Sequence, residues 1–166
     1  MSTIRKATVL AVALFMAISG QVNAQRSATT QIEEVVVTAQ KREENMQDVP
    51  ISMSAMDESA IEKAFARDLL DVAGMSPNFV IEPILGSGTA AIAIRGIMVA
   101  DVEKSYDPAV AVYLDGVYQA TTTGLLLNTW DAERIEILRG PQGTLFGRNT
   151  IGGLVSLTRT KPTGEL

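Results

Sequence analysis

The side chains that could do chemistry in this chain are mainly carboxylates, because its 166 residues include neither histidine nor cysteine. Without histidine the chain lacks the commonest general base and the commonest metal ligand. Without cysteine it has no thiolate metal site and no disulfide. Acidic pairs such as Asp57 with Glu58, or Asp131 with Glu133, could form an acid–base dyad, but each is equally typical of a helix cap or a solvated face. Nothing places two carboxylates across a cleft, so we expect no enzyme, no metal site and no cofactor.

The glycine-rich stretch from 140 to 153 raises the possibility of a nucleotide site. A phosphate-binding loop ends in Gly-Lys-Ser or Gly-Lys-Thr, and neither Gly140–Gly147 nor Gly147–Gly153 does so. Neither stretch is a dinucleotide-binding fingerprint. The net charge of -5 also argues against a nucleic-acid partner, which would require a basic face. We therefore interpret these glycines as turn residues that allow positive φ.

Arg139 ends a strand predicted over residues 134–139 and raises a question of pairing. With a period of two, Arg139 shares a face with Ile135 and Ile137, whereas Glu136 points the other way. A guanidinium at the end of an apolar face needs a partner, because an unpaired buried charge is costly. Two interpretations remain open: the strand ends before Arg139 and the side chain reaches water, or the partner lies outside this domain.

The N-terminus has the pattern of an export signal. A basic start and an apolar run over 7–18 precede the small residues Val22-Asn23-Ala24. The run is shorter than the roughly 20 residues that a membrane-spanning helix needs. A buried first helix is the alternative. We interpret residues 1–24 as a signal peptide cleaved between Ala24 and Gln25.

A β-branched run, Ile32–Ala39, lies within a polar stretch that extends from 25 to 48. Its three consecutive valines favour a strand, while the charged residues on both sides are unsuited to a core. One interpretation is an ordinary first strand of the domain's sheet. The other is an unpaired strand in a flexible segment, held for the sheet edge of a partner protein.

A compact domain is predicted over residues 49–162, and its elements are short. Asp57 is expected to cap a helix that begins at Glu58, with Phe65 on its apolar face; a second helix is expected over 68–73. A helical turn is expected within 123–130, and a turn or short helix over 143–149. Strands are predicted over 51–55, 79–81, 91–95, 110–114, 117–118, 134–139 and 154–160. Short strands and helices without βαβ alternation indicate the α+β class.

Several stretches, in this order, resemble the N-terminal plug domain of TonB-dependent outer-membrane receptors. The valine run resembles the TonB box, the periplasmic docking strand of these receptors. The remaining matches are Val49–Ser52, Ala93–Gly96, Val112–Tyr118, the long and specific block Arg134–Asn149, and Ile151–Ser156.

The resemblance implies a fold and partners. The fold is a small, mixed four-stranded sheet with short helices, seated in an outer-membrane β-barrel with its N-terminus facing the periplasm. The C-terminal domain of TonB adds as a strand to the box, which comprises Ile32, Glu33, Glu34, Val35, Val36, Val37, Thr38 and Ala39. Plug residues matching Arg95, Glu136 and Arg139 pair with the barrel wall. Transported substrates in this family are iron chelates, cobalamin or glycans.

A transporter barrel with a plugged lumen has about 22 strands of about 9–11 residues each, which requires more than about 200 residues. The sequence stops at Leu166, so residues 163–166 are expected to begin a missing barrel and the chain to be a fragment or a truncated product that cannot transport alone. The alternatives are a freestanding periplasmic module that binds a small ligand through Gly86–Ala90 and Thr121–Gly124, and a periplasmic hydrolase using serine or carboxylates.

The export signal gives a first prediction. Signal peptidase is expected to cleave after Ala24, because small residues stand at the recognised spacing. N-terminal sequencing of protein recovered from the periplasm or outer membrane should begin at Gln25. Full-length protein accumulating in the cytoplasm would refute the signal-peptide interpretation.

Overall fold

The computed structural model describes residues 35–84, 88–99, 106–162 and 164. The predicted signal peptide, its cleavage pair Ala24 and Gln25, the box residues Ile32, Glu33 and Glu34, and most of the expected barrel start lie outside the described residues. Within the described part, no helix is long and apolar enough to cross a membrane.

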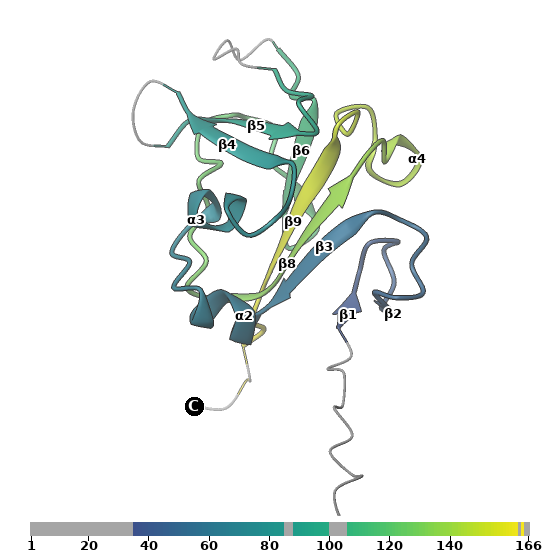
Figure 1. The fold of residues 1–166 in the computed structure, drawn as a ribbon, viewed down its shortest axis with the longest axis vertical. Helices are drawn as coiled ribbons and strands as arrows, with labels where there is room; N and C mark the ends of the chain where they lie inside the picture. Colours follow the sequence, from purple (N-terminus) through teal and green to yellow (C-terminus); the bar gives the residue numbers. More distant parts are fainter. Residues whose placement is uncertain (1–34, 85–87, 100–105, 163, 165–166) are drawn as a thin grey trace, which may run out of the picture. The chain divides into compact units, whose positions relative to one another are not determined.

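The centre of the fold is a five-stranded sheet (Figure 1). Its strands, in spatial order, are β3 (Met53–Asp57), β8 (Ala132–Arg139), β9 (Gly153–Arg159), β6 (Val110–Leu114) and β7 (Val117–Tyr118). Strands β6 and β9 run parallel and all other neighbours are antiparallel. The prediction of a mixed sheet in an α+β fold is confirmed. The sheet has a fifth strand because the two-residue β7 folds back on β6 at a tight turn.

In the part of the chain that the structure describes, two small hairpins and three short helices surround this sheet. Strand β1 (Val36–Val37) pairs with β2 (Glu44–Asn45), and β4 (Phe79–Pro83) pairs with β5 (Ala90–Ile94). The helices are α2 (Glu58–Lys63), α3 (Leu69–Ala73) and α4 (Gly143–Phe146). Figure 1 shows α2, α3 and the β4–β5 hairpin on one side of the sheet and β1–β2 on the other.

Aspartate caps begin α2 and α3. The Asp57 carboxylate accepts a hydrogen bond from the Ala60 backbone N–H at 2.8 Å, as predicted. The Asp68 carboxylate accepts one from Leu70 N–H at 2.9 Å. The expected position of Phe65 is wrong: α2 ends at Lys63, and Phe65 turns into the left-handed region at φ 54° with 85% of its surface exposed. This turn removes the ring from the helical face assigned to it.

The expected helical turn within 123–130 is also wrong. This segment is irregular: its backbone has a short-range bond from Leu127 N–H to Leu125 O at 2.9 Å but otherwise bonds to distant chain segments. Leu69 N–H donates to Leu127 O at 3.1 Å, and Thr129 N–H donates to Arg67 O at 3.0 Å. These long-range partners satisfy the groups that a local helix would have used.

Both faces of the sheet are covered by apolar side chains. On one face Ile135, Ile137, Val155 and Leu157 pack with side chains from α2, α3 and the β4–β5 hairpin. On the other face a smaller cluster contains Leu138, Leu154 and Ala111 together with Val37, Ala39 and Val49. Strand β8 is therefore buried from both sides, and the valine segment provides part of the second cover.

Gly153 should be among the positions least tolerant of substitution. Its φ is 142°, and a Cβ there would collide with the carbonyl oxygen of Leu138 and lie 2.9 Å from Ile94 Cδ1. Gly153→Ala should lower the free energy of unfolding by about 2–4 kcal/mol, measured by urea denaturation followed by circular dichroism.

Gly74→Ala is the matched control, because Gly74 has an ordinary φ of -68° and the nearest atom to an added Cβ is 3.8 Å away. It should change stability by less than about 1 kcal/mol. Equal effects of the two substitutions would contradict the packing around Gly153.

Candidate functional site

The valine segment lies against the second face of the sheet. The described part of the predicted box, Val35 to Ala39, contains β1. Val37 and Ala39 are almost fully buried, and Val36 is 41% exposed. Strand β1 pairs with β2 and not with an edge of the central sheet. The segment is thus neither the first strand of the central sheet nor an unpaired strand.

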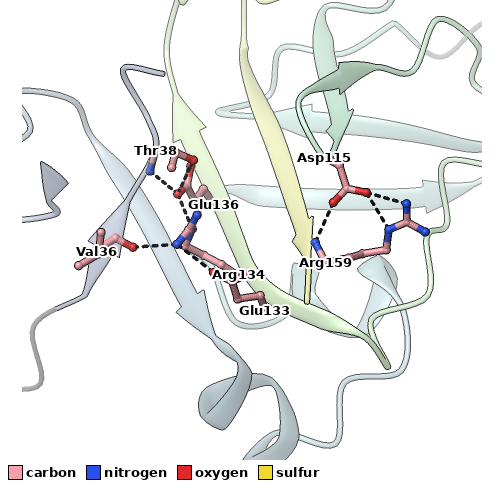
Figure 2. Close-up of polar contacts among 7 residues, drawn as sticks. All are labelled: Val36, Thr38, Asp115, Glu133, Arg134, Glu136 and Arg159. Carbon is pink, nitrogen blue, oxygen red and sulfur yellow. Dashed lines mark hydrogen bonds and ion pairs between the residues drawn. The ribbon is translucent and has the colours of Figure 1, made fainter. Parts of the chain in front are cut away.

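An ion pair on β8 holds this segment (Figure 2). Arg134 Nε lies 2.9 Å from Glu136 Oε1, and these side chains are 14% and 2% exposed. Glu136 Oε1 accepts a hydrogen bond from Thr38 N–H at 2.6 Å, and both carboxylate oxygens also contact Thr38 Oγ1. Arg134 Nη1 donates to Val36 O at 3.5 Å. The pair therefore connects β8 to two backbone groups of the valine segment.

The turn after β1 is seated on aromatic rings. Lys41 Nζ lies 5.4 Å from the centre of the Phe146 ring, which packs edge-on against Tyr113. Tyr113 Oη donates to Phe146 O at 2.7 Å, and burial raises the pKa of Tyr113 above its ordinary value. A cavity of about 290 Å³ lies between these rings and Glu136.

Arg139 lies on the face of Ile135 and Ile137, as the strand period predicted. Strand β8 extends through Arg139, so the interpretation that the strand ends earlier is wrong. Three of its hydrogen bonds go to neutral oxygens: to Ser54 Oγ at 2.7 Å, Ser76 Oγ at 3.2 Å and Met53 O at 2.8 Å. The guanidinium is thus satisfied inside the domain, but by no opposite charge among the described residues.

Arg95 joins Arg139 at the same place. Arg95 Nη2 donates to Ser52 Oγ at 3.1 Å, and Arg139 Nε donates to the same oxygen at 3.2 Å. Arg95 sits in a tight turn with φ 54° and is exposed. Of the three residues predicted to pair with a barrel, the structure brings together Arg95 and Arg139. Glu136 lies on the opposite face, with Arg134 and Thr38.

A second ion pair closes the end of the central sheet (Figure 2). Asp115, in the β6–β7 turn, accepts from Arg159 N–H at 2.8 Å and from Arg159 Nε at 2.8 Å, and lies 2.6 Å from Nη2. The backbone hydrogen bond from Arg159, supported by its guanidinium, lowers the pKa of Asp115 below its ordinary value. This pair fixes the hairpin to the last residue of β9.

The two loops proposed for small-ligand binding contact each other. Thr89 and Thr123 form an isolated bridge, and Ala90 N–H donates to Thr122 O at 3.3 Å. Residues 86 and 87 lie outside the described part. In the described residues, no group of three or more acidic, histidine or cysteine side chains gathers as a metal site would require.

The sequence-based interpretation missed two features. It expected Glu136 to pair with the barrel wall and did not pair it with Arg134; opposite charges two residues apart on a strand face were the available signal. It also missed a cavity of about 220 Å³ bordered by the exposed rings of Phe65 and Trp130. No sequence pattern indicated this cavity, because it depends on the left-handed turn at Phe65.

Comparison with known proteins identifies the family. A family model described as the TonB-dependent Receptor Plug Domain matches residues 45–154. The chain belongs to the TonB-dependent receptor plug domain family. The match includes Arg95, Arg134, Glu136 and Arg139 of this plug domain and excludes the valine segment.

Individual relatives agree. The pesticin receptor of Yersinia pestis is 39% identical over 71 residues, which are 43% of this chain and 10% of the receptor. The iron-regulated outer membrane virulence protein of Vibrio cholerae is 30% identical over 158 residues, 92% of this chain and 24% of that protein. The crystal structure of the ferric yersiniabactin uptake receptor of Yersinia pestis matches with a TM-score of 0.60 and 29% identity, over 68% of this chain and 17% of that one. The plug chain thus spans a quarter or less of these relatives.

The arginine cluster gives a third prediction. Arg139→Ala should lower the free energy of unfolding by about 1–3 kcal/mol, because four oxygens lose a charged donor and one of them belongs to the buried Ser76. Arg95→Ala, which removes an exposed side chain bonded to Ser52, should cost less than about 0.5 kcal/mol. Urea denaturation of both variants measures the difference. An unchanged midpoint for Arg139→Ala would show that water replaces these bonds without cost.

Proposed function

We propose that this chain is the gating and signal-receiving part of an outer-membrane active transporter, with the segment Ile32–Ala39 as its TonB box. The observation that carries the proposal is the valine segment itself. It is a short strand whose second edge is covered by side chains of β8 and by no strand of the described chain. A strand of this kind is suited to recognition by β-strand addition.

The relatives support a role in uptake and a location in the outer membrane. Their names are those of receptors and of an iron-regulated outer membrane protein, and one further relative is a ferrioxamine B receptor of Salmonella typhimurium. We propose an iron chelate as the substrate class, and binding and gating rather than catalysis as the activity. The plug and the N-terminus would face the periplasm, where TonB reaches the box.

The domain boundaries follow from this role. We propose a signal peptide over 1–24, a periplasmic segment with the TonB box over 25–48, the plug over 49–162 and the start of a barrel at 163–166. A complete receptor would contain the barrel that encloses the plug.

Pairing of the plug with that barrel is proposed for Arg95 and Arg139. Their guanidinium groups share Ser52 and have no carboxylate partner in the described residues. Two adjacent cations repel each other, and acidic side chains of a surrounding wall would relieve this repulsion. Glu136 was expected to join this pairing. Its carboxylate is buried against Arg134 and Thr38, so we assign its role to the box side of the sheet.

A proline at Val36 tests the docking role. In β1 the backbone groups of Val35 and Val37 face β2, since Met46 N–H donates to Val35 O at 2.9 Å. Val36→Pro therefore removes an N–H from the other edge and leaves the pairing with β2 intact. Affinity for a TonB C-terminal domain, measured by calorimetry, should fall about tenfold, the value of one lost hydrogen bond.

Val36→Thr keeps the β-branch and the N–H, so its affinity should stay within about twofold of the original. If Val36→Pro binds as tightly as Val36→Thr, TonB does not add a strand at this edge and the docking role is wrong.

A further inference from the structure

The two edges of β1 have different neighbours. Successive residues of a strand direct their backbone groups to opposite edges. The groups of Val35 and Val37 face β2, as the bond from Met46 N–H to Val35 O shows. The carbonyl of Val36 and the N–H of Thr38 face away from β2, toward the side chains of β8 (Figure 2), whereas the Thr38 carbonyl accepts from Lys41 N–H in the turn.

The side chains on that second edge have the hydrogen-bonding pattern of a strand. A neighbouring strand would offer a donor to Val36 O and an acceptor to Thr38 N–H. Arg134 Nη1 supplies the donor at 3.5 Å, and Glu136 Oε1 supplies the acceptor at 2.6 Å. The ion pair between Arg134 Nε and Glu136 Oε1, at 2.9 Å, holds donor and acceptor together.

We propose that Arg134 and Glu136 form an edge cap that must leave Val36 and Thr38 before a partner strand can add to the box. The inference rests on the proposed function, since it concerns how the same segment is regulated. The cap and an incoming strand need the same carbonyl and the same N–H, so they exclude each other. The box is thus held in a closed state. The stability of this state determines what fraction of the protein molecules can bind a partner strand.

Opening this cap leaves no charge without a partner. When the segment leaves, Arg134 and Glu136 keep each other, and Glu133 lies 3.7 Å from Arg134 Nη1 as a second acid. A cap built from side chains also makes few hydrogen bonds, since it satisfies two backbone groups, whereas a neighbouring strand would bond to every second residue along the edge. These properties allow the segment to be released without unfolding β8.

Amide exchange of Thr38 measures the cap without TonB. In the ¹⁵N-labelled chain, Glu136→Gln should speed exchange of the Thr38 amide about tenfold, because a neutral acceptor replaces a charged one. The amide of Leu157, in the buried centre of β9, should be unchanged and reports that the fold is intact. Glu133→Gln is the matched control: Glu133 is 44% exposed and contacts Arg134 but not the segment, so exchange at Thr38 should stay the same. Unchanged exchange in Glu136→Gln would overturn the cap.

A second variant covers the case in which Glu136→Gln disturbs the sheet. Thr38→Pro removes the capped N–H and the hydroxyl without altering β8. Exchange of the Val37 amide should then accelerate by a similar factor while Leu157 stays protected. Continued protection of Val37 would show that the cap does not hold the segment, and would overturn the proposal.

Binding of a TonB C-terminal domain separates the cap from the docking function. If the closed state limits binding, the affinity of Glu136→Gln should rise by the same factor as its Thr38 exchange. Faster exchange with unchanged affinity would overturn the competition between cap and partner. Protection of Thr38 that persists in the TonB complex would overturn it as well, since TonB would then use the edge facing β2. If neither chain binds TonB while Glu136→Gln still exchanges faster, the cap is supported and the docking function fails.

Discussion

Strand β8 is buried on both faces, and this constraint governs the arrangement of its charged side chains. A central strand normally carries apolar residues on both faces, because a buried charge without a partner costs several kcal/mol. Here Arg134 and Glu136 are placed on the second face and neutralise each other within one strand. Arg134 still has a free N–H donor and Glu136 a free acceptor. Both are directed away from the sheet, where the valine segment supplies the Val36 carbonyl and the Thr38 N–H as their partners. The seating of β1 is therefore a consequence of burying this pair.

The two faces of β8 have separate roles. Ile135 and Ile137 join the main core, which gives the fold its stability, and Arg139 ends that face among serine hydroxyls. On the other face the apolar cluster is small and depends on Val37 and Ala39 from the segment itself. Removing the segment would expose Leu138 and Leu154 but leave the main core complete. The main core therefore contains no side chain of the valine segment.

The sequence predicted those parts of the fold that depend on local chemistry. The cap at Asp57, the hairpin after Leu114 and the strand ending at Arg139 each follow from neighbouring residues. The errors arise where residues far apart in the sequence determine the structure. The segment 123–130 does not form the predicted helical turn, because its backbone bonds to residues near Arg67 and Thr89. Strand β2 was not predicted, because Glu44 and Asn45 are polar and pair with β1 over two residues only. The hydrogen bond from Thr38 to Glu136 joins residues 98 positions apart, and the sequence around neither residue indicates it.

The order of contacts along the chain determines how the plug would respond to a pull on its N-terminus. The pull first reaches β1, which is held by two residue pairs with β2 and by the cap on β8. The next barrier is β3, which pairs with β8 over five residue pairs. Arg139 reinforces the leading end of β3 by bonding to Ser52, Met53 and Ser54, the residues that the pull reaches first. The barrier that comes first therefore has fewer paired residues than the second. If the proposed partner strand binds the valine segment, release of this segment and opening of the sheet would be separate steps, because the two barriers involve different strands.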